Sequence, residues 1–150
     1  MREFHFRLQS ILDVRRYEED QRRLELGMIS SRCAALQREI DHRRNLRYRA
    51  LTVLEPGERL EDPGFRAAQA AYARRLANEM ARLERDLRSA EEERLEAVER
   101  YRVARRNADV LNRLRERRAT AFRRKEKQDE YRRMDEIAMS RRMRHGSAIQ

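Results

Sequence analysis

The stretch EPGERLEDPG, residues 55 to 64, contains both prolines and two of the four glycines of the 150-residue chain. Proline disfavours the helical conformation at the residue before it, here Glu55, and Gly57 can adopt the left-handed conformation that ends a helix. Asp62 followed by Pro63 is typical of an N-cap and the first position of a new helix. The sequence therefore predicts a helix, a short turn and a second helix.

The two predicted helices are long and unequal. The first covers about residues 3–54 and the second about residues 65–145, because the next helix breaker is Gly146 and the basic run before it suits a helix C-terminus. At ~1.5 Å per residue they would be roughly 75 Å and 120 Å long. Since the turn is short, we expect the helices to fold back as an antiparallel hairpin.

The composition agrees with helices rather than with a compact globule. Charged residues make up 43% of the chain and aromatic residues only 6%, and so many charges could not be buried without large desolvation costs. High charge also occurs in disordered chains, but Leu, Ala, Met and Tyr recur here at helical spacing, as in coiled coils. We therefore predict an all-α fold, an antiparallel coiled-coil hairpin forming a single domain over residues 1–150.

Apolar residues with alternating three- and four-residue spacing should form the contact between the helices, which we call the seam. In the first helix the predicted seam is Leu8, Leu12, Leu26, Ile29, Cys33, Leu36, Ile40, Ala50 and Leu54. In the second helix it is Tyr72, Leu76, Met80, Leu83, Leu87, Ala90, Ala97, Tyr101, Ala104, Ala108 and Leu111. The spacing 72–76–80–83 covers eleven residues, so we expect the supercoil to relax locally there.

Folding the chain about the centre of the turn places residue i near residue 119 − i, so that Leu12 would meet Asn107. The first helix would then end against about residue 115 of the second. Everything beyond would project as a single helix roughly 45 Å long at the C-terminal end, which we call the overhang. Residues 113–150 hold 13 basic and 6 acidic residues, most of the chain's net charge of +10. An excess of positive charge at one end favours an acidic protein surface or a polyanion as partner.

The residues themselves leave three interpretations of the overhang open: binding of a partner protein, a merely solvated helix, or binding of nucleic acid. Acidic residues among the arginines, such as Asp129 and Glu130, would repel a phosphate backbone. A structural coiled-coil oligomer, in which two overhangs pair, is a further alternative for the whole chain.

No pattern in the sequence indicates catalysis, a metal or a cofactor. Cys33 lies on the predicted seam and is expected to be a small buried apolar residue. The three histidines are far apart in the sequence, and adjacent acids such as Glu91 and Glu92 lie on different helix faces. With no apolar run near the ~18 residues of a membrane span and no signal peptide at the N-terminus, we expect a cytoplasmic protein that is not an enzyme.

Two terminal stretches resemble a known family. They are FHFRLQSILDVRRYEED, residues 4–20, with an aromatic pair followed by Arg-Leu-Gln, and RRKEKQDEYRRMDEIAMSRR, residues 123–142, with its Asp-Glu-Ile-Ala step at 135–138. Both are similar to the opening and closing segments of the flagellar export protein FliJ family, and the turn also falls where that family has it. The resemblance covers nearly the whole chain.

The resemblance implies a cytoplasmic, non-catalytic component of the flagellar type III export apparatus at the cytoplasmic face of the cell membrane, at the flagellar base. FliJ proteins look like the γ-subunit coiled coil of rotary ATP synthases. They are thought to insert into the hexameric export ATPase, to contact the cytoplasmic domain of the export gate and to engage substrate chaperones. No nucleic-acid partner is expected; the alternatives are a structural coiled-coil oligomer or a basic nucleic-acid-binding helical protein.

The resemblance also directs the choice of candidate site residues. The candidates for ATPase binding, all on the overhang, are Phe122, Arg123, Arg124, Lys125, Tyr131, Arg132, Arg133, Met134, Asp135, Glu136 and Ile137. The candidates for export-gate binding, near the turn, are Leu46, Tyr48, Phe65, Tyr72 and Leu76. For the second group the alternative is that they only hold the hairpin together.

Overall fold

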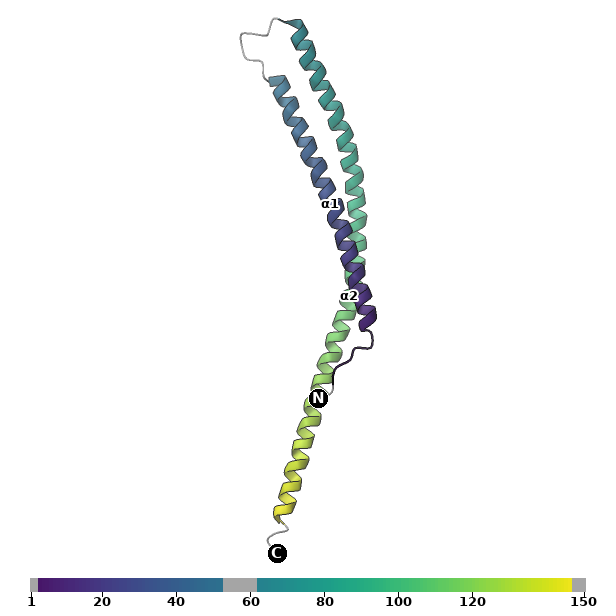
Figure 1. Ribbon diagram of the computed structural model, residues 1–150, viewed down its shortest axis with the longest axis vertical. Helices are drawn as coiled ribbons and strands as arrows, with labels where there is room; N and C mark the ends of the chain where they lie inside the picture. The colour runs from purple at the N-terminus through teal and green to yellow at the C-terminus, as the bar shows by residue number, and fades with distance from the viewer. Residues whose placement is uncertain (1–2, 53–61, 147–150) are drawn as a thin grey trace. The chain divides into compact units, whose positions relative to one another are not determined.

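The computed structural model describes residues 3–52 and 62–146. They form two α-helices, α1 (Gln9–Thr52) and α2 (Pro63–Gly146), and these residues contain no strand. Figure 1 shows the two helices side by side along α1. The predicted all-α fold with a longer second helix is confirmed. Most of the predicted turn lies outside the described residues.

The start of α2 has the geometry expected from its sequence. The backbone N–H of Gly64 donates a hydrogen bond of 2.9 Å to the Asp62 side chain, and the N–H of Arg66 donates to the carbonyl of the same residue. Asp62 is therefore the N-cap, and Pro63 begins the helix, where its missing N–H leaves no bond unmade.

The start of α1 differs from the expectation. Residues 3–8, which we call the strap, are not helical, and α1 begins only at Gln9. The N–H of Gln9 donates to the carbonyl of Phe6, and the Phe6 side chain is only 4% exposed. Burial of this aromatic ring stabilises a non-helical path for the strap, because a fully buried Phe contributes about 1.5–3 kcal/mol.

The residues fall into two compact units, one with Met1–Tyr17 and Arg105–Gln150 (unit 1), the other with Glu18–Ala104 (unit 2). In unit 2, Arg43 pairs with Glu79 at 3.0 Å and Arg32 with Glu93 at 3.3 Å. A third pair joins Glu25 to Arg100 at 2.9 Å. Residue numbers fall along α2 as they rise along α1, so the two helices are antiparallel.

The core of unit 2 follows the predicted seam, with one exception. Ile40 of α1 and Ala90 and Ala97 of α2 are 1% exposed or less. Tyr72, however, is 43% exposed, and Ala73 is buried in its place. The seam therefore runs 73–76–80–83 with regular three- and four-residue steps, and the eleven-residue spacing from which the relaxation was predicted is wrong. A small alanine at this position lets the helices approach, whereas a tyrosine ring keeps its hydroxyl in water.

In unit 1, the start of the chain packs against the middle of α2. Leu12 and Ala108 are fully buried, and Arg16 donates a hydrogen bond to Asn112. The ring of Phe4 lies 5.7 Å from that of Phe122, centroid to centroid, at an interplanar angle of 52°. This tilted arrangement is one that aromatic pairs prefer.

The predicted register is wrong. It places residues 76, 94 and 103 opposite Arg43, Glu25 and Arg16, whereas these side chains contact Glu79, Arg100 and Asn112. The partners thus lie three, six and nine residues further along α2. A connection of ten residues can reach roughly 30 Å when extended, so its midpoint does not fix the register. Packing and ion pairing along the two helices fix the register instead.

The overhang is also shorter than predicted. The non-helical strap continues along α2 beyond the start of α1, and its Phe4 contacts Phe122. Glu126 and Asp129 are still half-buried, and every residue from 130 to 144 is exposed. We call residues 130–146 the tip; at ~1.5 Å per residue these 17 residues extend about 25 Å.

Candidate functional site

The predicted ATPase-binding residues all lie on α2 within unit 1, but in two different settings. Ten of the eleven are exposed, including Tyr131 at 70%, Met134 at 63% and Ile137 at 51%. Phe122 is the exception, because its ring packs against Phe4 of the strap. It therefore contributes to the packing of unit 1 rather than to an open surface.

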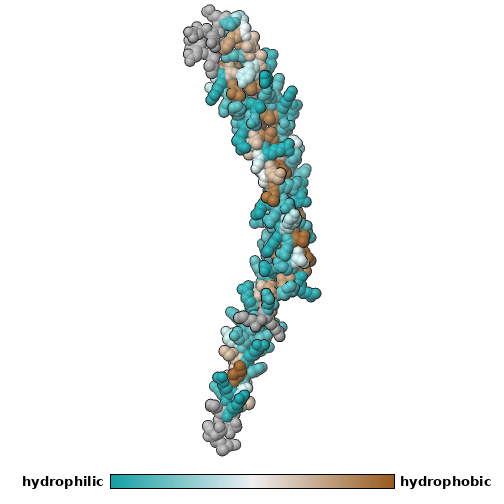
Figure 2. Space-filling model, in the orientation of Figure 1, coloured by the Kyte–Doolittle hydropathy of each residue, from teal (hydrophilic) through white to brown (hydrophobic). Residues whose placement is uncertain are grey.

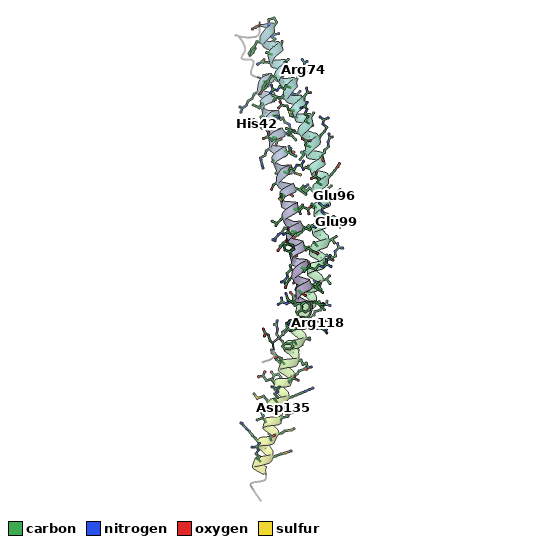
Figure 3. All side chains as sticks on the ribbon, turned by 45° about the vertical axis from the view of Figure 1, so that its right-hand side comes forward. His42, Arg74, Glu96, Glu99, Arg118 and Asp135 are labelled. Atoms are coloured by element: carbon green, nitrogen blue, oxygen red, sulfur yellow. The ribbon has the colours of Figure 1, made fainter. Side chains whose placement is uncertain are left out.

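The tip presents apolar and charged side chains together. Tyr131, Met134 and Ile137 follow at intervals of three residues, so each lies about 60° around the helix from the last. Together they cover about a third of the circumference, with charged neighbours on either side. Figure 3 shows the labelled Asp135 on this part of α2, pointing away from the helix axis. Such a surface suits a partner that has both apolar and charged groups.

Most of the positive charge of unit 1 lies outside the tip. Residues 105–129 contain ten basic and four acidic residues, whereas residues 130–146 contain five basic and three acidic ones. The sequence alone assigns the charge excess to the overhang as a whole. The structure places the larger share beside the segment that contacts the strap and the start of α1.

An open groove runs along α2 in the same segment. Its lining residues come from one helix and include Arg113, Arg117, Thr120, Ala121, Arg124 and Gln128. The groove is mainly basic, with Glu116 and Asp129 at its sides. The sequence analysis missed this surface, although the three- and four-residue spacing of its residues is visible in the sequence.

The predicted gate-binding residues in unit 2 divide by burial. Leu76 is 4% exposed and belongs to the core, and Leu46 and Phe65 are half-buried. Tyr48 and Tyr72 are 68% and 43% exposed. Leu76 thus holds the two helices together, while the two tyrosines lie on the surface. Figure 2 shows that hydrophobic atoms on the visible face form scattered spots in a largely hydrophilic surface.

Ion pairs connect the helices of unit 2 and shift the pKa of two carboxyl groups. Hydrogen bonds from Arg43 and then Arg75 hold the pKa of Glu79 below its usual value. The pKa of Glu25 is lowered first by its bond to Arg22 and then by the charge of Arg100. These groups are solvated, so the pairs favour the antiparallel arrangement without forming a reactive site.

Candidates for other chemistry are few. In the parts of the chain that the structure describes, no group of three or more His, Cys, Asp or Glu side chains could hold a metal ion. Cys33 is a half-buried free thiol on the seam. Nor does any helix in the described ranges have the length and apolar character needed to cross a membrane.

Comparison with known proteins identifies the family. A family model described as the flagellar FliJ protein matches residues 4–147. The chain belongs to the FliJ family. No curated protein and no solved structure matches it.

Membership of the FliJ family supports a role in flagellar protein export and association with the export apparatus, of which FliJ is a non-catalytic component. The matched range includes α1, α2 and all eleven ATPase-binding candidates. A long helical hairpin is consistent with this role, since partner binding needs an exposed surface rather than an enclosed pocket.

Proposed function

We propose that this FliJ-family chain is a non-enzymatic part of the flagellar export apparatus that binds the hexameric export ATPase through α2. One observation carries the proposal: every described side chain from 130 to 144 is exposed, and the exposed set includes Tyr131, Met134 and Ile137. Large apolar side chains on a projecting helix cost free energy in water, and a partner that covers them recovers it. The same chain also binds the cytoplasmic domain of the export gate and emptied substrate chaperones.

The affinity of the tip for the ATPase should be modest and sensitive to salt. Exposed ion pairs contribute less than about 1 kcal/mol each, and salt screens them. The three apolar side chains supply the part of the affinity that salt does not weaken. A helix with a mostly polar surface of this kind can contact several subunits of a ring in turn without binding one of them permanently.

Stimulation of the export ATPase tests the proposal. Deleting residues 130–150 removes the tip together with residues 147–150 and keeps Phe4 and Phe122, so unit 1 should keep its packing. We expect this truncation to abolish ATPase stimulation. Replacing Tyr131, Met134 and Ile137 by serine should lower stimulation at least tenfold.

The control replaces Leu95, an exposed leucine of unit 2 at 66% exposure, by serine. It should stimulate as the unmodified chain does. Full stimulation by the truncated chain would overturn the proposed role of the tip.

The exposed tyrosines of unit 2 support the second contact, with the export gate. Tyr48 and Tyr72 are the two gate candidates that present large apolar area to solvent. Changing both to alanine should abolish binding to the gate's cytoplasmic domain and leave the thermal unfolding of the hairpin within about 2 °C. A large loss of thermal stability with binding retained would show instead that the tyrosines only hold the hairpin together.

A further inference from the structure

A second heptad-like stripe runs along α2, on the face away from α1. It consists of Val110, Leu114, Arg117, Ala121 and Arg124, which follow at steps of four, three, four and three residues. This is the spacing with which a helix contacts another helix along one face. We call these five residues the second stripe.

The second stripe lies opposite the buried seam. Ala108 is fully buried against α1, and Val110, two residues on and about 200° around the helix, is 61% exposed. Arg117, Ala121 and Arg124 are exposed as well, and Leu114 is half-buried. The stripe therefore has helix-contact spacing but no helix against it among the described residues.

The groove along α2 lies on the same face. Arg117, Ala121 and Arg124 of the second stripe line it, and the groove extends from Arg113 at one end to Arg132 at the other. The groove and the stripe share these three residues, so they describe one surface of α2, the groove by its shape and the stripe by its residue spacing. Both indicate a place where an elongated partner fits.

Charge decides what kind of partner fits. Arg117 and Arg124 form no ion pair with any other residue in the described ranges, and they lie in a segment with ten basic and four acidic residues. A guanidinium binds a carboxylate through two parallel hydrogen bonds, which suits glutamate on a facing helix. A second copy of this chain fits less well, because pairing two stripes in register, parallel or antiparallel, places Arg117 opposite Arg117.

We propose that the second stripe binds an acidic amphipathic helix of another protein, making α2 the middle helix of a three-helix arrangement in unit 1. The partner's apolar residues cover Val110, Leu114 and Ala121, and two of its carboxylates pair with Arg117 and Arg124. All five stripe residues lie outside the tip, so the contact does not require residues 130–146, although Arg124 is also an ATPase-binding candidate and the groove reaches Arg132 of the tip.

A synthetic helical peptide tests the proposal with the full-length chain. The probe is a fluorescein-labelled 21-residue peptide with leucines at the three positions that face Val110, Leu114 and Ala121. Glutamates occupy the two positions that face Arg117 and Arg124. Binding is measured by fluorescence anisotropy at physiological ionic strength. We expect saturable binding, weakened at least tenfold by the double variant Arg117→Glu, Arg124→Glu.

The matched control is the double variant Arg115→Glu, Arg123→Glu, which has the same net charge but alters exposed residues about 100° around the helix from the nearest stripe residue, one on each side. It should bind the peptide within threefold of the unmodified chain. Equal weakening by the two double variants would show general charge attraction and overturn the proposal. So would equal binding of a peptide with lysine in place of the two glutamates.

Three further measurements distinguish the proposal from other occupants of the stripe and from the proposed function of the tip. A dimer by light scattering that Val110→Ser abolishes would assign the stripe to a second copy. Failure to bind the peptide, together with binding of phosphatidylglycerol vesicles or duplex DNA, would assign it to a polyanionic surface; either result overturns the proposal. The chain truncated after residue 129 should still bind the peptide, whether or not the tip binds the ATPase.

Discussion

The contact between Phe4 and Phe122 gives a prediction that can be worked out in detail. The rings lie 5.7 Å apart and are tilted by 52°, an arrangement that contributes about 0.5–1.5 kcal/mol beyond the burial of area. Changing either residue to alanine removes the same contact. The two single variants and the double variant therefore form a cycle whose coupling energy should fall in this range.

Amide hydrogen exchange of Gln9 and Leu12 is the direct assay, because their N–H groups donate to the carbonyls of Phe6 and Leu8 in the strap. If the strap detaches, these bonds open, so loss of the aromatic coupling alone should lower their protection by about two- to thirteen-fold. Tyr131→Ala, which removes an exposed aromatic ring of the tip, should leave the protection unchanged. Effects of Phe4→Ala and Phe122→Ala that add to within about 0.3 kcal/mol would refute the reasoning.

Four further predictions concern stability. Gly27→Ala should raise the free energy of unfolding by about 0.5–1 kcal/mol, because the new Cβ meets no atom within 4 Å; a lower midpoint in urea would contradict this. Asp62→Ala should cost about 1 kcal/mol through loss of the N-cap bond to Gly64, while Asp62→Asn retains most of it, as circular dichroism in urea would measure. Leu76→Ala should cost about 2–5 kcal/mol in the same assay, whereas exposed Leu95→Ala should cost less than about 0.5 kcal/mol. The pKa of Glu79 is lowered by its arginine partners, so its contribution is present above about pH 4.5 and lost as the pH falls through the lowered value. Glu79→Gln should therefore flatten the fall in melting temperature between pH 7 and pH 3, and the exposed Glu84→Gln should not; equal acid sensitivity of the two variants would contradict the assignment.

The fold was readable from the sequence because its signals are local. The Asp62 side chain caps the N-terminus of α2, and Pro63 occupies its first position. The alanines at 90, 97, 104 and 108 repeat at the spacing of a buried helix face. Each of these features depends on a few neighbouring residues. A physical argument about local geometry is sufficient for them.

The register and the strap were not readable, because they depend on contacts between distant parts of the chain. Helical periodicity identifies the face that is buried but not the residue opposite, so Glu25 could pair with any arginine within reach until packing chose Arg100. The path of residues 3–8 depends on the burial of Phe6 and on the contact of Phe4 with Phe122, which is far away in the sequence.

The candidate sites were readable in part. Tyr131, Met134 and Ile137 are exposed because α2 is much longer than α1, and the sequence shows this difference in length. The second stripe was overlooked because two of its five positions are arginine and a third is the small Ala121, which gives a weak apolar signal. Its importance emerges only when the groove and the opposite seam are seen together.

The tip is a helical segment attached to a helix that already exists, so it never faces the unfavourable nucleation step that makes short free peptides unfold in water. Its ordered length is instead set by a balance at each successive residue, and melting begins at the C-terminal turn and moves inward. Cooling or a bound partner lengthens the ordered part, and warming shortens it. The distance to which this arm reaches is therefore an adjustable quantity, controlled by temperature and by whatever the arm touches.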